Sequence, residues 1–238
     1  MNKKKYKRIL LKLSGEALLG YRPYGIDPIV CDYIAKEIDK LVKSKIEVVV
    51  VFGGGNIFRG LAAEKNGMKR VTGDYLGMLA TVMNSLALGS ALDKIGVENR
   101  VQSALDMSKV CEPYIRNRAL RHLEKGRVVI VGAGSGHPYF TTDTAAAVRA
   151  CELDCEVVVK ATKVSGIFNK DPKLNKDAKK IKKLKYLDIL NNNYQVMDST
   201  AVTLCMDNNI PIMVLELMKE GTILKACEGK DVGSIIQG

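Results

Sequence analysis

The sequence predicts an α/β fold, a three-layer α/β/α sandwich with a mostly parallel central sheet. Residues 48–52 are four valines and a phenylalanine, and a strand without a polar face must be buried on both sides, as in a parallel sheet. Two further apolar runs, at 9–13 and 128–131, also lead into glycines. Helical patterns alternate with these runs, which is typical of a sheet covered by helices on both faces.

The expected elements follow this alternation along the chain. We expect strands at 8–13, 47–52, 99–103, 127–132 and 155–161, and helices at 28–43, 72–95, 114–125 and 142–152. Beyond them we expect a short hairpin at 164–168, a polar loop at 169–180, a helix near 199–208 and a strand at 211–216. Asp27-Pro28 and residues 72–74 fit helix N-terminal capping, and Gly96 and Gly126 fit helix ends.

Length and composition favour one domain over residues 1–238. The chain is 47% hydrophobic, which is enough for one large core, and it has no Pro/Ser-rich linker. Its basic start imitates a signal peptide, but Lys12 interrupts the apolar run and no small-residue cleavage site follows. We find no run of about 20 apolar residues and therefore expect a cytoplasmic protein without a membrane span.

The six cysteines include no C-x-x-C pair, and only two histidines could join them around a metal. We therefore expect free thiols in a reducing compartment and no zinc site. His122 lies in a predicted helix and fits a structural role. His137 lies in a glycine-rich loop, where it fits either a ligand contact or a turn.

The net charge of +11 comes from two clusters. Residues 1–12 hold six basic and no acidic side chains, and residues 160–185 hold ten lysines against two aspartates. The lysine-rich segment 179–185 within the second cluster has Tyr186 as its one adjoining aromatic side chain, whereas nucleic-acid surfaces interleave several aromatics with basic residues. A solvated, lysine-rich surface strand is the better interpretation, and we expect no nucleic-acid partner.

Glycines at the ends of three strands indicate phosphate binding. Residues 53–55, Gly15 and residues 132–136 place backbone N–H groups where no Cβ blocks a phosphate, and Arg59 adds a planar cation. Tight strand-to-helix turns are the alternative explanation. The G-x-x-x-x-G-K-[ST] motif is absent, and His137 replaces the third glycine of the dinucleotide motif, which excludes P-loop kinases and ordinary Rossmann dehydrogenases.

Seven segments together resemble the bacterial UMP kinases of the amino acid kinase superfamily. They are, in order, residues 12–16, 53–60, 72–74, 78–84, 140–143, 160–168 and 171–172, and they span most of the chain. The resemblance implies transfer of the γ-phosphoryl group of ATP to UMP, giving UDP and ADP in pyrimidine nucleotide biosynthesis. It also implies that Mg²⁺ arrives with ATP, so that no resident metal site is needed.

The same resemblance assigns the site residues. It places Lys12 at the transferring phosphoryl group, Arg59 where the two phosphates meet, and Asp198 where it orients the lysine; these are the catalytic candidates. The ATP-binding candidates are Lys12, Leu13, Ser14, Gly15, Gly55, Arg59, Thr162, Phe168 and Asp171. The UMP-binding candidates are Gly54, Asp74, Ser135, Gly136, His137, Pro138, Tyr139, Phe140, Thr141 and Thr142. Helix capping is the alternative role for Asp74 and Asp198.

The resemblance further implies a homohexamer with UTP as an inhibitor. Residues 78–88 are apolar around most of a helix, more than one sheet-facing stripe requires. Gly89 and Ser90 stand where relatives that respond to GTP often carry charged or imidazole side chains, although Arg100 and Arg127 remain available nearby. We therefore expect little response to GTP.

Two alternative functions stay open on the sequence. Other members of the superfamily phosphorylate carboxylates or carbamate, against which Asp74 and residues 140–143 favour a nucleotide acceptor. A nucleotide-sensing regulator without turnover is the second alternative, and the presence of Lys12 and Asp198 argues against it.

Overall fold

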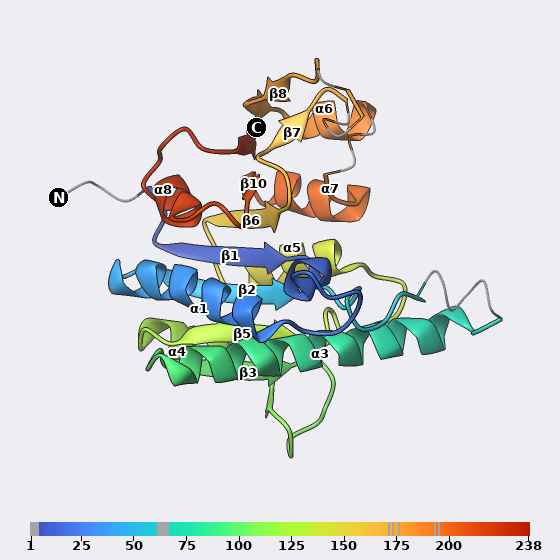
Figure 1. Cartoon of the computed structure of the whole chain (residues 1–238), viewed down its shortest axis with the longest axis vertical. Coiled ribbons are helices and arrows are strands. Elements are labelled where there is room, and N and C mark those ends of the chain that lie inside the picture. Colours follow the sequence, from blue (N-terminus) through green and yellow to red (C-terminus); the bar gives the residue numbers. More distant parts are fainter. Residues whose placement is uncertain are drawn as a thin grey trace.

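The computed structural model describes residues 5–60, 67–170, 172, 174–175, 177–192, 194 and 196–238. Its main sheet has the strand order β4-β3-β5-β2-β1-β6-β10-β11-β9 (Figure 1). These strands are β1 (Arg8–Leu13), β2 (Glu47–Phe52), β3 (Asn99–Ser103), β4 (Glu112–Pro113), β5 (Val128–Gly132), β6 (Val157–Thr162), β9 (Lys183–Leu184), β10 (Ile212–Glu216) and β11 (Ser234–Ile236). A separate antiparallel pair joins β7 (Ile167–Phe168) to β8 (Lys180–Ile181).

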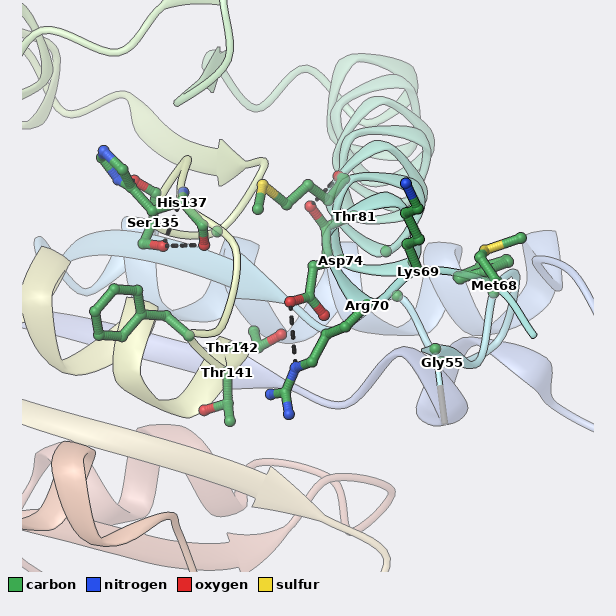
Figure 2. A pocket seen from close by; sticks show the side chains of 18 residues that line it. Gly55, Met68, Lys69, Arg70, Asp74, Thr81, Ser135, His137, Thr141 and Thr142 are labelled. Atoms are coloured by element: carbon green, nitrogen blue, oxygen red, sulfur yellow. Dashed lines mark hydrogen bonds and ion pairs between the residues drawn. The ribbon is translucent and has the colours of Figure 1, made fainter. Parts of the chain in front are cut away.

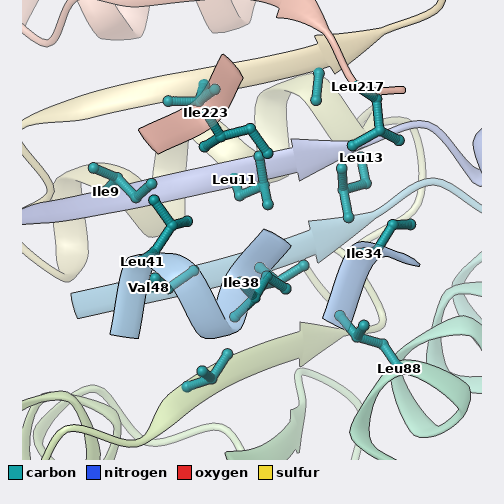
Figure 3. Packing of buried hydrophobic residues seen from close by; sticks show 14 of the residues in the cluster. Ile9, Leu11, Leu13, Ile34, Ile38, Leu41, Val48, Leu88, Leu217 and Ile223 are labelled. Carbon is teal, nitrogen blue, oxygen red and sulfur yellow. The ribbon is translucent and has the colours of Figure 1, made fainter. Parts of the chain in front are cut away.

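Helices cover both faces of this sheet, as the sequence predicts. One face packs against α1 (Pro28–Lys43), α3 (Arg70–Lys94) and α8 (Thr222–Cys227), and Figure 3 shows their apolar side chains against those of the strands. The other face packs against α4 (Arg116–Glu124), α5 (Thr142–Glu152), α6 (Tyr186–Asn191) and α7 (Ser199–Asp207). A 3₁₀ turn, η1 (Gly15–Leu19), follows β1.

The strand alternation decides which face carries the chemistry. Ile9, Leu11 and Leu13 belong to the core beneath α1, α3 and α8, whereas Leu10 belongs to the core beneath α5. Because side chains alternate along a strand, Lys12 shares the α5 face with Leu10. Strand β1 pairs in parallel with β2 on one side and β6 on the other, so the chain winds outward in both directions from β1. Open α/β sheets bind ligands at the carboxyl ends of strands at such a position.

The five long strands and the long helices are confirmed, with ends that shift by a few residues. The shorter elements β4, β11, α6 and α8 were not predicted, because a segment of two to six residues shows little periodicity. Gly96 and Gly126 follow the ends of α3 and α4 with φ near +76°, and Asp27 caps α1 through the Ile29 N–H, as predicted.

One expectation for α3 is wrong, and its hydropathy needs an explanation. The helix begins at Arg70, with Lys69 at the N-cap position, so Asp74 is an interior residue and not a cap. In addition, α3 is long and apolar enough to cross a membrane, the one such helix in the described part of the chain. More than half of its apolar window is buried inside the fold, against α1, β3 and β5. Burial in the domain core therefore explains its apolar composition.

Gly89 in α3 and the two arginines Arg100 and Arg127 also differ from the sequence interpretation. Gly89 is buried, and a Cβ there would lie 3.0 Å from Val101 Cγ2, so this position has no room for a surface charge. Arg127 donates to Glu98 over 2.8 Å, and Arg100 Nε lies 3.7 Å from Glu112 Oε1. Both arginines are thus already paired with carboxylates instead of being available.

The thiols and His122 agree with the sequence interpretation. All six cysteines are free, and four of them are buried. Burial raises the pKa of the Cys31 thiol to about 11, which keeps it protonated and unreactive at neutral pH. The Nε2 atom of His122 lies 3.1 Å from Glu112 Oε2, so the ring joins α4 to β4 in a structural contact.

Candidate active site

Two lysines and one aspartate form a compact charged centre at the carboxyl end of β1. Lys12 on β1 and Lys160 on β6 are register partners in adjacent strands and share one face of the sheet. Asp143, in the first turn of α5, lies between them: its Oδ1 is 2.6 Å from Lys12 Nζ, and its Oδ2 is 2.9 Å from Lys160 Nζ. Lys160 also donates to the carbonyl of Val196.

The aspartate makes this pairing of two cations possible. Like charges directly opposite each other on a sheet are destabilising, and burial increases that cost. Burial opposes ionisation of Asp143, yet the charges of Lys12 and Lys160 outweigh it and hold the pKa of that carboxyl below its usual value. Burial and the Lys12 charge lower the pKa of Lys160, against the attraction of Asp143. The two lysines and one aspartate therefore give this centre a net positive charge at the carboxyl ends of β1 and β6.

Asp198 connects two helix N-termini beside this centre. It caps α7 by accepting the Ala201 N–H over 3.0 Å, so the capping role proposed for it is confirmed. It also accepts hydroxyl hydrogen bonds from Thr144, over 2.9 Å, and from Thr141, which is itself the N-cap of α5. The expected contact with Lys12 is instead made by Asp143, and Asp198 is linked to that centre by its hydrogen bonds to Thr141 and Thr144 and by its charge beside Lys160.

The glycine turn after β2 is held by a buried pair of asparagines. Asn56 and Asn84 exchange two amide hydrogen bonds of 2.8 Å, and Asn84 also donates to the carbonyl of Gly53 over 2.7 Å. A Cβ on Gly15 would lie 2.4 Å from that same carbonyl, and one on Gly54 would lie 2.6 Å from the Gly77 carbonyl. These glycines are required by close backbone approach, which supports the structural as well as the phosphate-binding explanation.

We expect Gly54→Ala to destabilise the fold by about 1–3 kcal/mol, because the added methyl group must displace the backbone of α3. The matched control is Gly77→Ala, at a helix position where a Cβ meets nothing within 4 Å and where alanine stabilises by up to about 1 kcal/mol. Urea unfolding followed by circular dichroism measures both. Equal stability changes in the two variants would contradict the close packing at Gly54.

A pocket of about 450 Å³ lies next to the charged centre (Figure 2). Its walls are the glycine turn, the first turns of α3, and the loop between β5 and α5. Asp74 points into the space between α3 and that loop, where its Oδ2 accepts the Tyr139 N–H over 2.8 Å and lies 3.7 Å from Arg70 Nε. Thr142, which lines the pocket, directly precedes Asp143, so the pocket and the charged centre are adjoining parts of one site.

The loop between β5 and α5 has a strained backbone, and a buried arginine of α5 holds it in place. Ala133 and Tyr139 have φ of +61° and +72°, in the left-handed region that costs non-glycine residues free energy. Arg149, which is 6% exposed, donates to the Gly134 carbonyl over 3.3 Å, to Glu152 over 2.6 Å, and stacks on the Tyr114 ring at 4.0 Å. This buried arginine fixes the loop against α5.

The sequence profile of the amino acid kinase family matches residues 7–216. The chain belongs to the amino acid kinase family. Solved structures agree with this assignment. A UMP kinase from Bacillus anthracis shares 42% identity at a TM-score of 0.94, over 98% of this chain and 96% of that one. A UMP kinase from Ureaplasma parvum shares 36% identity at a TM-score of 0.91, over 98% of this chain and 100% of that one. A uridylate kinase from Archaeoglobus fulgidus shares 27% identity at a TM-score of 0.71, over 96% of this chain and 99% of that one.

In this member of the amino acid kinase family, most of the predicted acceptor residues lie close together around the pocket. The pocket wall includes seven of them: Gly54, Asp74, Ser135, His137, Phe140, Thr141 and Thr142. Tyr139 contacts Asp74 through its N–H. Gly136 and Pro138 belong to the same loop without lining the pocket, and Gly136 packs tightly, since a Cβ there would lie 3.0 Å from the Ala104 carbonyl.

The predicted donor residues are less concentrated. Leu13, Ser14 and Gly15 follow Lys12 directly at the end of β1, whereas Gly55 lines the pocket with the predicted acceptor residues. Arg59 is exposed and donates to Glu16 over 3.0 Å and to the Gly55 carbonyl over 3.2 Å. Thr162 ends β6 with its hydroxyl donating to the Val164 carbonyl, and Phe168 lies in β7. Asp171 lies outside the described residues.

Sequence reasoning missed Asp143, Lys160 and Arg149. Asp143 and Lys160 both stood in segments that carry the family resemblance, and Lys160 interrupts an apolar strand at the position where Lys12 interrupts β1. A charged residue in a strand that is otherwise buried on both faces was therefore the available clue. Arg149 gave no such clue, because an arginine in a helix is ordinary and its partners are distant in sequence.

Proposed function

We propose that this chain transfers the γ-phosphoryl group of ATP to UMP, giving UDP and ADP in pyrimidine nucleotide biosynthesis. The observation that carries the proposal is the Lys12–Asp143–Lys160 centre adjoining a pocket that contains Asp74. The 42% and 36% identities to UMP kinases over 98% of the chain support UMP as the acceptor. We take residues 1–238 as one amino acid kinase domain, since the sheet runs from β1 to β11.

The reaction needs charge neutralisation more than it needs a base. The acceptor phosphate has a second pKa near about 6, so it is already a nucleophilic dianion at neutral pH. The difficulty is that two polyanions must meet while negative charge spreads over the transferred group. Lys12 and Lys160, held together by Asp143, supply positive charge that is fixed before the substrates bind. The N–H groups of the glycine turn and the α5 N-terminus add oriented dipoles.

We expect Mg²⁺ to arrive with ATP. The described residues hold no group of three or more His, Cys, Asp or Glu side chains that would bind a metal unaided. Magnesium sites in kinases commonly combine one or two carboxylates with phosphate oxygens, and the hard oxygens of Asp198, beside the charged centre, fit that requirement. Mg²⁺ would add charge neutralisation between the nucleotide phosphates.

Asp74 is the residue that we assign to the UMP ribose. It lines the pocket from α3 and its role as a helix cap is excluded, which leaves a carboxylate facing the cavity. A ribose hydroxyl can donate to this carboxylate in place of the Tyr139 N–H. The loop residues Ser135, Thr141 and Thr142 offer hydroxyls to the base and phosphate of the same nucleotide.

A coupled assay of ADP release tests the proposal against its alternatives. With Mg-ATP as donor, we expect rapid turnover of UMP, and turnover of CMP, dCMP and small carboxylates lower by at least about 100-fold, because unpaired polar groups in the site penalise the wrong acceptor. Turnover of acetylglutamate equal to that of UMP would assign the chain to the carboxylate kinases. Nucleotide binding without any turnover would favour the regulator.

We propose a cytoplasmic homohexamer with UTP as a feedback inhibitor. Tyr75, Leu79, Met83 and Leu86 recur every three or four residues along α3 and are exposed despite being apolar. Such a stripe on a helix that already packs on the sheet indicates a second, intermolecular face. Arg100 and Arg127, the two arginines that the sequence offered for an effector, are paired with carboxylates.

Light scattering and activity assays test the assembly together with its regulation. We expect a hexamer mass for the parent chain. Met83→Glu should give a smaller species, because the charge at position 83 would be buried in the interface. GTP should change the rate of the parent chain by less than about twofold at fixed free Mg²⁺. The exposed substitution Lys36→Glu on α1 is the control. A monomer mass for the parent chain, or strong saturable activation by GTP, would contradict the respective half.

A further inference from the structure

A second cavity shares no lining residue with the pocket beside the charged centre. Its volume is about 580 Å³, and its walls are the segment before β1, β9, the residues after α8, and the turn at 229–233 that leads into β11. Lys12 and Thr162 mark the carboxyl ends of β1 and β6, whereas this cavity touches Tyr6, before β1 begins. In Figure 1, α8 lies beside the tail of the β1 arrow. The wall also reaches Gly233, where a Cβ would lie 2.3 Å from the carbonyl of Val214 in β10.

The cavity wall is strongly basic. It contains four lysines, Lys5, Lys182, Lys183 and Lys230, from three separate segments, and one carboxylate, Asp231. Lys182 is paired with Asp231, and Lys230 Nζ lies 2.7 Å from Glu228 Oε2. Within the described part of the chain, Lys5 and Lys183 form no direct ion pair with a carboxylate, and Lys183 acts on Asp231 only at longer range, where its charge helps to lower the pKa of that carboxyl. The wall therefore holds positive charge that the protein itself does not neutralise.

Tyr6 adds an independent sign of a missing partner. This residue lines the cavity and is only 6% exposed, and its hydroxyl makes no hydrogen bond among the described residues. The Lys5 ammonium lies 5.2 Å from the centre of its ring. A buried O–H group that has lost water without gaining a partner is costly, and such groups are rare in folded proteins. Because the hydroxyl oxygen is itself closed to solvent, an acceptor oxygen from a ligand would reach it only if the Tyr6 side chain moved.

We propose that this cavity binds a small phosphate-bearing anion, at a site separate from the phosphoryl-transfer site. Lysine ammonium groups suit phosphate oxygens as point charges, and the volume is in the range of small-molecule pockets. Tyr6 is the one aromatic residue among the described residues of the wall, and it is buried, so the wall offers no platform for base stacking. A compact anion therefore fits the cavity better than a nucleic-acid strand.

Methionine-methyl NMR reports on each site separately in the full chain. Met213 lines this cavity, and Met78 lines the pocket beside the charged centre. With ¹³C-methyl methionine and pyrophosphate as the probe at constant ionic strength, we expect a saturable shift of the Met213 resonance, identified by its loss in Met213→Leu. Lys5→Glu combined with Lys183→Glu should abolish that shift, because both ammonium groups line the cavity. Lys36→Glu, on exposed α1, should leave it unchanged.

Three results would overturn the proposal. A Met213 shift that grows linearly without saturation, or that persists in the Lys5→Glu/Lys183→Glu variant, would reduce the effect to general screening. A saturable shift at Met78 alone would place pyrophosphate only in the phosphoryl-transfer site. Displacement of pyrophosphate by a short RNA of higher affinity would assign the surface to nucleic acid. Lys183→Ala alone, at an exposed position, provides the same comparison if the double variant does not fold.

Discussion

Lys12→Met should lower kcat by about 100- to 1,000-fold, while the KM values for ATP and UMP change by less than about threefold. The Lys12 side chain is 10% exposed, and methionine fills nearly the same space without the charge. The lost interaction is one that strengthens as negative charge develops on the transferred phosphoryl group, so it affects the transition state more than either bound substrate. Steady-state kinetics with each substrate varied in turn measures the separation.

Two comparisons guard this interpretation of Lys12. Lys36→Met removes an exposed lysine from α1, away from the site, and should leave kcat unchanged. The thermal unfolding of Lys12→Met should also remain cooperative, because Asp143 keeps Lys160 as its partner. An intact kcat in Lys12→Met would remove the lysine from the chemistry. A large rise in both KM values at constant kcat would instead make it a substrate-binding residue.

The sheet was predictable because its strands have a strong and local signature. Residues 48–52 are apolar without interruption, so burial on both faces follows from the sequence alone. The antiparallel strand β11 has three residues, and its place depends on pairing with β10 across a turn at Gly233, where a Cβ would lie 2.3 Å from the Val214 carbonyl. That constraint is tertiary, and no periodicity announces it.

The family resemblance named most of the residues that meet around the pocket, whereas in the charged centre it named Lys12 but neither Asp143 nor Lys160. The pocket residues form continuous segments, such as the loop 135–142, which a motif transfers as a block. Asp143 comes into contact with Lys12 and Lys160 only after α5 has packed over β1 and β6. Asp198 illustrates the same limit: its capping bond is local and was expected, whereas its bonds to Thr141 and Thr144 bridge more than 50 residues of sequence.

Asp143→Asn should have the second largest effect and should act on activity and stability together. Asparagine keeps the shape of the side chain and removes the charge that separates two partly buried lysines. We expect kcat to fall at least about 100-fold, since both ammonium groups lose their fixed positions. Leaving buried charges without their partner costs about 3–5 kcal/mol, measured by urea unfolding at pH 7.

The pH dependence gives this second prediction its sharpest test. The pKa of Asp143 is lowered in the folded state, so its stabilisation is fully present above the usual value of 3.8 and disappears as the pH falls through the lower, folded-state pKa. The stability difference between Asp143→Asn and the parent chain should therefore be constant near neutral pH and shrink in acid. Asp143 also raises the pKa of Lys160 against the effects of burial and Lys12, so its loss should move the alkaline fall of any residual activity to lower pH.

A double variant separates repulsion between the lysines from a simple packing defect. Adding Lys160→Met to Asp143→Asn removes one of the two unpaired cations, so part of the lost stability should return while kcat stays low. If Asp143→Asn disturbed only the packing of α5, the second substitution would leave stability unchanged or lower it further. Recovery of stability without recovery of kcat would establish two roles for Asp143. Its carboxylate offsets the repulsion between Lys12 and Lys160 in the fold, and it holds both ammonium groups where the phosphoryl group passes.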